Sequence, residues 1–84
     1  MSYEVIVERK ARKAIARLPA RVYDRVMQAI DDLAEDPRPR QSRQLQGSQA
    51  RRLRVGDYRV VYDVDGEDLR VFVAEVWHRQ RGYR

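Results

Sequence analysis

The sequence is poor in several residue types, and each shortage narrows what the chain can be. It contains no cysteine, which excludes disulfide bonds and thiolate metal sites and fits a reducing compartment. No apolar run approaches the roughly 20 residues that span a bilayer, and the first residues lack the basic-then-apolar order of a secretory signal. With 84 residues there is room for one small domain. We therefore expect a single cytoplasmic domain over residues 1–84, with no membrane partner.

Positive charge is what the chain has in excess. Its 18 Lys and Arg outnumber 13 Asp and Glu, giving a net charge of +5, and nearly all of the cations are arginine. The planar, permanently charged guanidinium group can bind two phosphate oxygens at once, so an arginine-rich excess favours a nucleic-acid partner. A basic surface that only keeps the protein in solution is the alternative. The distribution of the arginines along the chain has to decide between them.

The first half of the chain has the periods of one strand and two helices. Residues 3–8 alternate between apolar and polar side chains, as a strand does. From Arg9 to Leu18 the apolar residues recur every three or four positions, and Pro19 ends this stripe. A second stripe runs from Val22 to Leu33 before Asp36 and Pro37 stop it. The pattern predicts an N-terminal strand followed by a helix hairpin.

The second half predicts a β-meander. Residues 38–50 have little to bury, so we expect an irregular surface connection there. Two alternating segments then flank Gly56-Asp57, which is typical of a hairpin turn, and residues 69–77 form a third, largely apolar strand that should be central and covered on both faces. The order β-α-α-β-β-β predicts an α+β domain with a four-stranded, mainly antiparallel twisted sheet and the helix hairpin on one face.

The predicted hairpin gathers positive charge on one sheet face. A two-residue turn at Gly56-Asp57 places Arg54 directly opposite Arg59, with Arg52 two residues away on the same face. Like charges opposite each other destabilise a sheet by up to about 1 kcal/mol, a cost that a bound polyanion would offset. Residues 38–59 contain seven arginines and one acid. Phosphate binding is the favoured reading, although acids in residues 63–68 could instead pair with these arginines.

The C-terminal run 77–84 carries further groups that can act in catalysis. It contains the sole histidine, His78, together with Tyr83 and three arginines. Neighbouring arginines would disfavour a charged imidazolium, so His78 is a candidate general base, although a lone histidine is more often structural. Tyr83 could pack at the C-terminus, or its ring could carry an unstacked base with the hydroxyl directed at the phosphate.

Three stretches together resemble a known protein family. They are Leu45-Gln46-Gly47, the hairpin Arg52-Leu53-Arg54-Val55-Gly56-Asp57-Tyr58-Arg59-Val60-Val61-Tyr62, and His78-Arg79 followed by Tyr83-Arg84. In this combination the chain is similar, over essentially its whole length, to the RelE branch of the RelE/ParE toxins. The hairpin and the C-terminal ending are the specific parts of the resemblance, and the helices add little.

The resemblance implies a ribosome-dependent endoribonuclease that cuts messenger RNA and is silenced by a cognate antitoxin protein. Attack of the ribose 2′-hydroxyl on the adjacent phosphate would need no metal or other cofactor. The implied catalytic residues are Arg52, Arg54, Arg59, Arg79 and Tyr83, with His78 beside them. The best-known members have lysines in place of the first two. Because arginine holds its proton above pH 12, Arg52 and Arg54 are expected to bind charge and not to remove protons.

Roles follow from this chemistry. Arg54, Arg59 and Arg79 would stabilise charge on the phosphorane, and His78 or Tyr83 would move protons. Other arginines would hold the backbone of the RNA: Arg38, Arg40, Arg43, Arg81 and Arg84. Strict alternation along the last strand, however, places His78 on the arginine face and Arg79 on the opposite one. A bulge after Val76 would bring Arg79 to the cluster; without it, His78 is the better catalytic candidate.

Two other functions remain open at this point. A toxin of the ParE branch shares the fold but inhibits DNA gyrase without catalysis, and would not need the grouped arginine, histidine and tyrosine. A plain RNA- or DNA-binding module would bind through the same arginines and cleave nothing. An antitoxin partner rests on the resemblance, and its physical motive is that an apolar groove and a sheet edge on so small a domain suit a partner segment.

Overall fold

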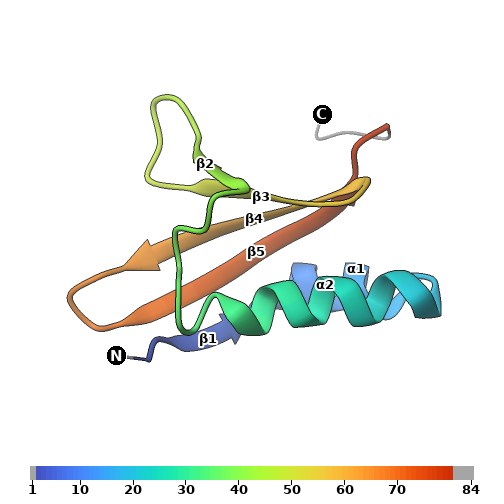
Figure 1. The fold of residues 1–84 in the computed structure, drawn as a ribbon, viewed down its shortest axis with the longest axis horizontal. Coiled ribbons are helices and arrows are strands. Elements are labelled where there is room, and N and C mark those ends of the chain that lie inside the picture. Colours follow the sequence, from blue (N-terminus) through green and yellow to red (C-terminus); the bar gives the residue numbers. More distant parts are fainter. Residues whose placement is uncertain (1, 81–84) are drawn as a thin grey trace.

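A computed structural model describes residues 2–80 of the chain, which form one twisted sheet and two helices (Figure 1). In chain order the elements are β1 (Glu4–Val7), α1 (Arg9–Ala16), α2 (Ala20–Asp32), β2 (Ser42–Gln44), β3 (Arg51–Val55), β4 (Tyr58–Asp65) and β5 (Arg70–His78). The strand order in the sheet is β1-β5-β4-β3-β2. β1 runs parallel to β5, and the other neighbours are antiparallel.

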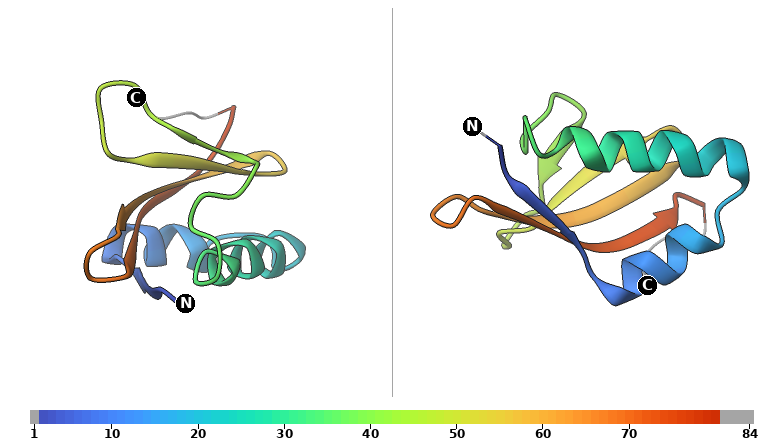
Figure 2. Two further views of the ribbon diagram at one scale, coloured as in Figure 1. Left: turned by 60° about the vertical axis from the view of Figure 1, so that its left-hand side comes forward. Right: turned by 90° about the horizontal axis from the view of Figure 1, so that it is seen from below.

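Both helices lie on the same face of the sheet (Figure 2). Their predicted apolar stripes supply Ala11 and Ile15 from α1 and Val26 and Ile30 from α2 to the core. The sheet meets them with alternate side chains, and the fully buried ones of larger size include Tyr62, Leu53, Val60, Val71 and Val73. The predicted α+β class and helix hairpin are therefore confirmed. No helix within residues 2–80 is long and apolar enough to cross a bilayer.

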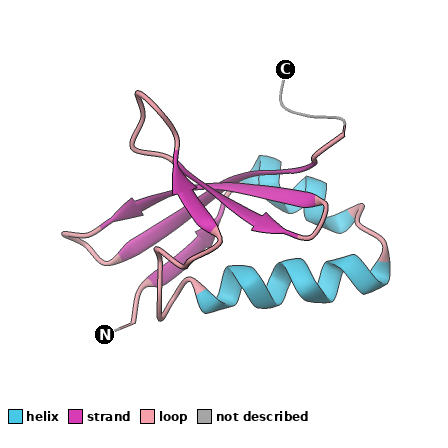
Figure 3. Cartoon of the chain, turned by 45° about the horizontal axis from the view of Figure 1, so that its top comes forward, coloured by secondary structure: helices cyan, strands magenta, loops and turns pink. Residues whose placement is uncertain are grey.

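The prediction of four strands is wrong, because the sheet has five. The additional strand β2 lies inside the segment expected to be an irregular connection, and its central residue Arg43 pairs with Arg52 of β3. β2 has three residues and only Ser42 is buried, so its side chains show no alternating pattern that would predict a strand. Backbone pairing with the otherwise free edge of β3 holds it there. The resulting β2–β3 hairpin projects away from the helices (Figure 3).

Strand β5 is paired on both sides, as expected for an inner strand, but only one of its faces is closed. Val71, Val73 and Val76 are buried against the helices, whereas Phe72 and Ala74 on the remaining face are half-buried. The spacing of the buried valines changes because β5 contains a bulge: Tyr62 pairs with Val73, and Val61 pairs with Glu75. A bulge was expected after Val76 and occurs before it. From this point the alternation of β5 is reversed.

The turn between β3 and β4 is tight, with only Gly56 and Asp57 between the paired residues Val55 and Tyr58. Gly56 has φ +57°, which matches the first position of a type II′ hairpin turn. This confirms the predicted register, with Arg54 directly opposite Arg59.

Replacing Gly56 with alanine is expected to lower the free energy of unfolding by about 1–3 kcal/mol, because a side chain at positive φ is strained. The new methyl group would also lie 3.3 Å from an Nη atom of Arg25. Gly66→Ala is the matched control, since no atom lies within 4 Å of its Cβ position. Urea unfolding followed by circular dichroism measures both. Equal stability of the two variants would contradict a strained turn.

Candidate nucleic-acid interface

Arginines from three strands and the preceding loop line one hollow on the sheet face away from the helices. The hollow has a volume of about 250 Å³ and is lined by Arg40, Gln41, Arg43, Arg52, Arg54 and Arg59. Within residues 2–80, the lining includes no carboxylate and none of these arginines is in an ion pair. The expected convergence of Arg52, Arg54 and Arg59 is therefore found. We call this hollow the arginine pocket.

The pocket forms here because register and alternation leave no other direction for these side chains. Arg43 pairs with Arg52, and Arg54 pairs with Arg59, so two cross-strand arginine pairs share the sheet face. The intervening residue Leu53 points the other way and is buried in the core. Burial of the apolar residues thus commits the arginines to the open face.

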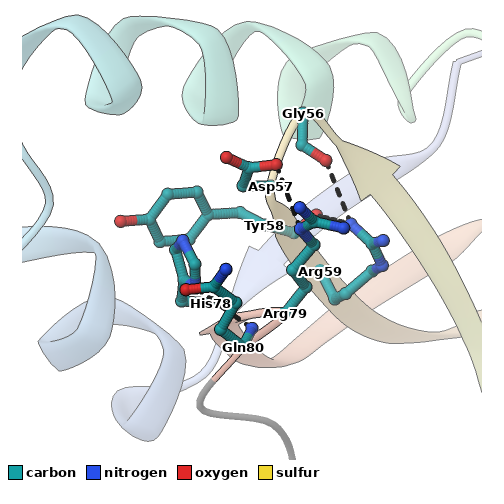
Figure 4. Close-up of polar contacts among 7 residues, drawn as sticks. All are labelled: Gly56, Asp57, Tyr58, Arg59, His78, Arg79 and Gln80. Atoms are coloured by element: carbon teal, nitrogen blue, oxygen red, sulfur yellow. Dashed lines mark hydrogen bonds and ion pairs between the residues drawn. The ribbon is translucent and has the colours of Figure 1, made fainter.

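Arg59 is the most constrained of the cluster. Its Nη1 donates to the carbonyl oxygens of Gly56, at 3.1 Å, and Tyr58, at 2.9 Å (Figure 4). Partial burial and the guanidinium groups of Arg52, Arg54 and Arg79 lower the pKa of Arg59, while the Asp57 carboxylate opposes this effect. Positive charge is therefore concentrated around Arg59, and an anion in the pocket would relieve the repulsion.

Arg79 reaches the same region from the end of β5. Its Nε lies 3.2 Å from Oδ1 of Asp57, and its backbone N–H donates to the Asp57 carbonyl oxygen at 2.8 Å (Figure 4). The reversed alternation after the bulge is what brings it here, since Trp77 and not Val76 now pairs across from Arg59. The expectation that a bulge would unite Arg79 with the cluster is met, although the bulge lies earlier in the strand.

His78 lies on the other side of the sheet from the arginine pocket. It pairs with Tyr58, and the two rings meet edge to face with centroids 5.0 Å apart (Figure 4). Tyr58 itself packs against the hydrophobic core, and His78 Nδ1 accepts a hydrogen bond from the backbone N–H of Gln80 at 3.1 Å. The structure therefore does not bring His78 to the arginines, contrary to the grouping expected from simple alternation.

The remaining predicted residues divide into three sets. Arg40 and Arg43 line the arginine pocket, as expected for residues that hold RNA. Arg38 is exposed and is not among the residues that line it. Three predicted residues lie outside the described part of the chain: Arg81, Tyr83 and Arg84.

Two residues at this site were not anticipated from the sequence. Trp77 ends the segment that was expected to be covered on both faces, yet it is half-buried and pairs with Arg59 on the open face. Asp57 was considered only as a turn residue, yet its carboxylate contacts Arg79. The Gly-Asp turn signal was visible, but the bulge that brings Arg79 beside it has no signature in the sequence.

A second and larger hollow, of about 570 Å³, lies between α2 and β3. Ala29, Leu53 and Val55 contribute apolar surface to it. Its lining also includes three carboxylates, from Asp24, Asp32 and Asp36, and one guanidinium group, from Arg25. The net negative charge makes this groove unsuited to a phosphate backbone and suited to a partner with basic side chains.

The chain matches one protein-family model over most of its length. The family model described as the ParE toxin of type II toxin-antitoxin system, parDE, matches residues 5–83. No protein with a curated description matches the chain significantly.

Several solved structures have the same fold. The chain is 32% identical to a chain of the archaeal RelE-RelB complex from Pyrococcus horikoshii OT3, with a TM-score of 0.85, covering 98% of this chain and 100% of that one. It is 30% identical to a chain of the toxin-antitoxin complex RelBE2 from Mycobacterium tuberculosis, with a TM-score of 0.83 and coverage of 94% and 100%. For the intact E. coli RelBE complex the identity is 27%, the TM-score 0.79, and the coverage 99% and 100%.

Proposed function

This chain belongs to the RelE/ParE superfamily of toxins from type II toxin–antitoxin systems, and we propose that it is a ribosome-dependent endoribonuclease that cuts messenger RNA. The observation that supports this function best is the arginine pocket, where guanidinium groups from separate strands surround a space with no carboxylate in its described lining. Such a pocket is suited to one phosphodiester group and its developing negative charge.

The reaction that we propose is transfer of the phosphoryl group within the RNA. The ribose 2′-oxygen loses its proton and attacks the adjacent phosphorus, and the bond from phosphorus to the 5′-oxygen of the next nucleotide breaks. That oxygen takes up a proton, which leaves a 2′,3′-cyclic phosphate and a 5′-hydroxyl. Arg54, Arg59 and Arg79 stabilise the extra negative charge on the phosphorane.

The proton steps need a group other than these arginines, which stay protonated near neutral pH. His78 is on the far side of the sheet, in contact with Tyr58. We therefore assign proton transfer to Tyr83, which is also the residue that the family resemblance assigns to the site. Arg40 and Arg43 hold the RNA backbone at the rim of the pocket.

We also propose a cognate antitoxin as the protein partner. The similar chains from Pyrococcus horikoshii OT3, Mycobacterium tuberculosis and E. coli were each solved in complex with their antitoxins. In this chain the groove between α2 and β3 offers apolar surface and three aspartates, a combination that suits an antitoxin segment with apolar and basic side chains.

The test uses purified protein and ribosomes programmed with a defined message. We expect cleavage of the message with cyclic phosphate ends only when ribosomes are present, and growth arrest in bacteria that is relieved by the neighbouring antitoxin gene. An intact message together with normal growth would contradict the proposal. Binding of RNA that weakens with salt but never leads to cleavage would indicate a binding module instead.

Inhibition of DNA gyrase is the second candidate function. It is favoured by one specific finding, namely that the matching family model is that of the ParE toxin. A gyrase supercoiling assay, run beside the ribosome assay, separates the two. Inhibited supercoiling with an uncut message would establish the second function in place of the first.

A further inference from the structure

We propose that Asp57 is a positioning residue that holds Arg79 beside the arginine pocket, next to Arg59. This inference deepens the proposed nuclease function and rests on it for its kinetic consequences. The geometric part, that Asp57 fixes the Arg79 side chain, can be tested without any activity.

Asp57 contacts Arg79 twice. The backbone carbonyl of Asp57 accepts the Arg79 N–H at 2.8 Å, which fixes where the chain lies at the end of β5. The Asp57 carboxylate lies 3.2 Å from Arg79 Nε, which fixes the direction of the side chain. The backbone and the side chain of Asp57 thus determine the position and the direction of the Arg79 guanidinium group.

Arg79 needs such a contact to stay where it is. Arg79 follows the last residue of β5, so its side chain is not held between neighbouring strands. About half of the side chain is exposed, at 54%, and the neighbouring strand β4 carries Arg59. Repulsion between the guanidinium groups of Arg59 and Arg79, which is one of the causes that lower the pKa of Arg59, would drive an unheld Arg79 toward solvent.

Residues at the turn between β3 and β4 hold two arginines in place. While Asp57 holds Arg79, the carbonyl oxygens of Gly56 and Tyr58 hold Arg59. Three consecutive residues, 56–58, therefore orient two guanidinium groups, one on β4 and one directly after β5 (Figure 4). The carboxylate at position 57 offsets one positive charge of the site, which is expected to lower the affinity for RNA. Removal of this carboxylate should therefore not weaken RNA binding through charge alone.

An ordinary structural role for Asp57 makes a different prediction, because aspartate is common in hairpin turns. If Asp57 served only the turn, its replacement would lower stability and leave the chemistry of the folded protein unchanged. If it positions Arg79, replacement lowers kcat while RNA binding is retained or becomes tighter. Separate measurement of kcat and KM therefore distinguishes the two roles.

The kinetic experiment compares Asp57→Ala, Asp57→Asn and Asp63→Ala on programmed ribosomes. Asp63 is the matched control because it is exposed on β4, the strand that begins directly after Asp57, and its removal changes the net charge equally. We expect Asp57→Ala to lower kcat about tenfold without raising KM, a change equivalent to about 1.4 kcal/mol. Asn retains an oxygen that can accept from Arg79 Nε, so Asp57→Asn should recover part of the loss. Asp63→Ala should leave kcat unchanged.

A double-mutant cycle tests whether the effect passes through Arg79. In an Arg79→Ala background, Asp57→Ala should lower kcat no further, because the group that it positions is gone. Additive losses would overturn the proposal, as would an Asp57→Ala variant with the kcat of the Asp63→Ala control.

A nuclear magnetic resonance measurement separates failure of this inference from failure of the nuclease proposal. In the wild-type protein the Arg79 Nε–Hε signal should be resolved and slow to exchange, and Asp57→Ala should shift it and speed its exchange while Asp63→Ala does not. If no variant cleaves RNA yet this pattern is found, the nuclease function is wrong and the positioning contact stands. If the Arg79 signal is the same in all three proteins, the positioning role is wrong whatever the activity.

Discussion

Replacing Arg59 with alanine is expected to lower the rate of message cleavage by about 10²–10³-fold, the usual loss when one preorganised donor to a developing oxyanion is removed. Arg59 is half-buried at the pocket, and two carbonyl oxygens hold its guanidinium group in place before any substrate binds. The loss should appear in kcat more than in KM, because the stabilised charge is greatest in the transition state.

Arg12→Ala is the matched control for this variant. It removes the same charge from an exposed position on α1, on the helix-covered side of the sheet. Single-turnover cleavage on programmed ribosomes would measure both variants, and circular dichroism would show that both are folded. Similar rates for Arg59→Ala and wild type would remove the arginine pocket as the site of chemistry. A loss shared equally by Arg12→Ala would show that only overall charge matters.

Tyr62→Ala is expected to lower the free energy of unfolding by about 3–5 kcal/mol, because it leaves a cavity where a large ring is buried. Tyr62 is fully buried at the centre of β4, and its hydroxyl donates to the Pro37 carbonyl oxygen at 2.8 Å. A chain of this length has a net stability of about 4–13 kcal/mol. The substitution would therefore remove a large part of the stability.

Two further variants identify the cause of that loss. Tyr62→Phe keeps the ring but leaves the Pro37 carbonyl unpaired, so it should cost about 1–2 kcal/mol. Tyr23→Ala removes the same side chain from a position on α2 that is 43% exposed, so it should cost less than about 0.5 kcal/mol. Urea unfolding measures all three. A Tyr62→Ala variant as stable as Tyr23→Ala would contradict the assigned core.

The Tyr62 contact also shows how the core supports the site. Pro37 begins the segment that leads to Arg40 and then to β2, both of which border the arginine pocket. The buried hydrogen bond therefore ties this segment to the middle strand of the sheet.

The elements with a strong side-chain period could be predicted from the sequence. The stripes that end at Leu18 and Leu33 placed both helices, and the alternation around Gly56-Asp57 placed the hairpin with Arg54 opposite Arg59. These features are local, because each residue's partners lie within a turn of helix or across a two-residue loop. It followed directly that Arg52, Arg54 and Arg59 share one face of the sheet.

Two features depended on contacts between distant parts of the chain. β2 exists because the edge of β3 is free to pair, and its own residues show no strand period. The bulge in β5 lies where its pairing with β4 shifts by one residue, opposite Val61 and Tyr62, and it reverses which residues face the pocket. Simple alternation therefore assigned His78 and Arg79 to the wrong faces.

The sequence by itself determined the class of fold, the arginine content of one hairpin face and the register of its central pair, because burial of the alternate apolar residues left those side chains only one direction. Only the tertiary structure decided that Arg40 and Arg43 complete the pocket, that His78 turns toward Tyr58, and that Asp57 holds Arg79. The physical reason is that a single inserted residue in β5 changes the direction of every side chain after it, and this insertion is set by pairing with β4 and not by any local preference.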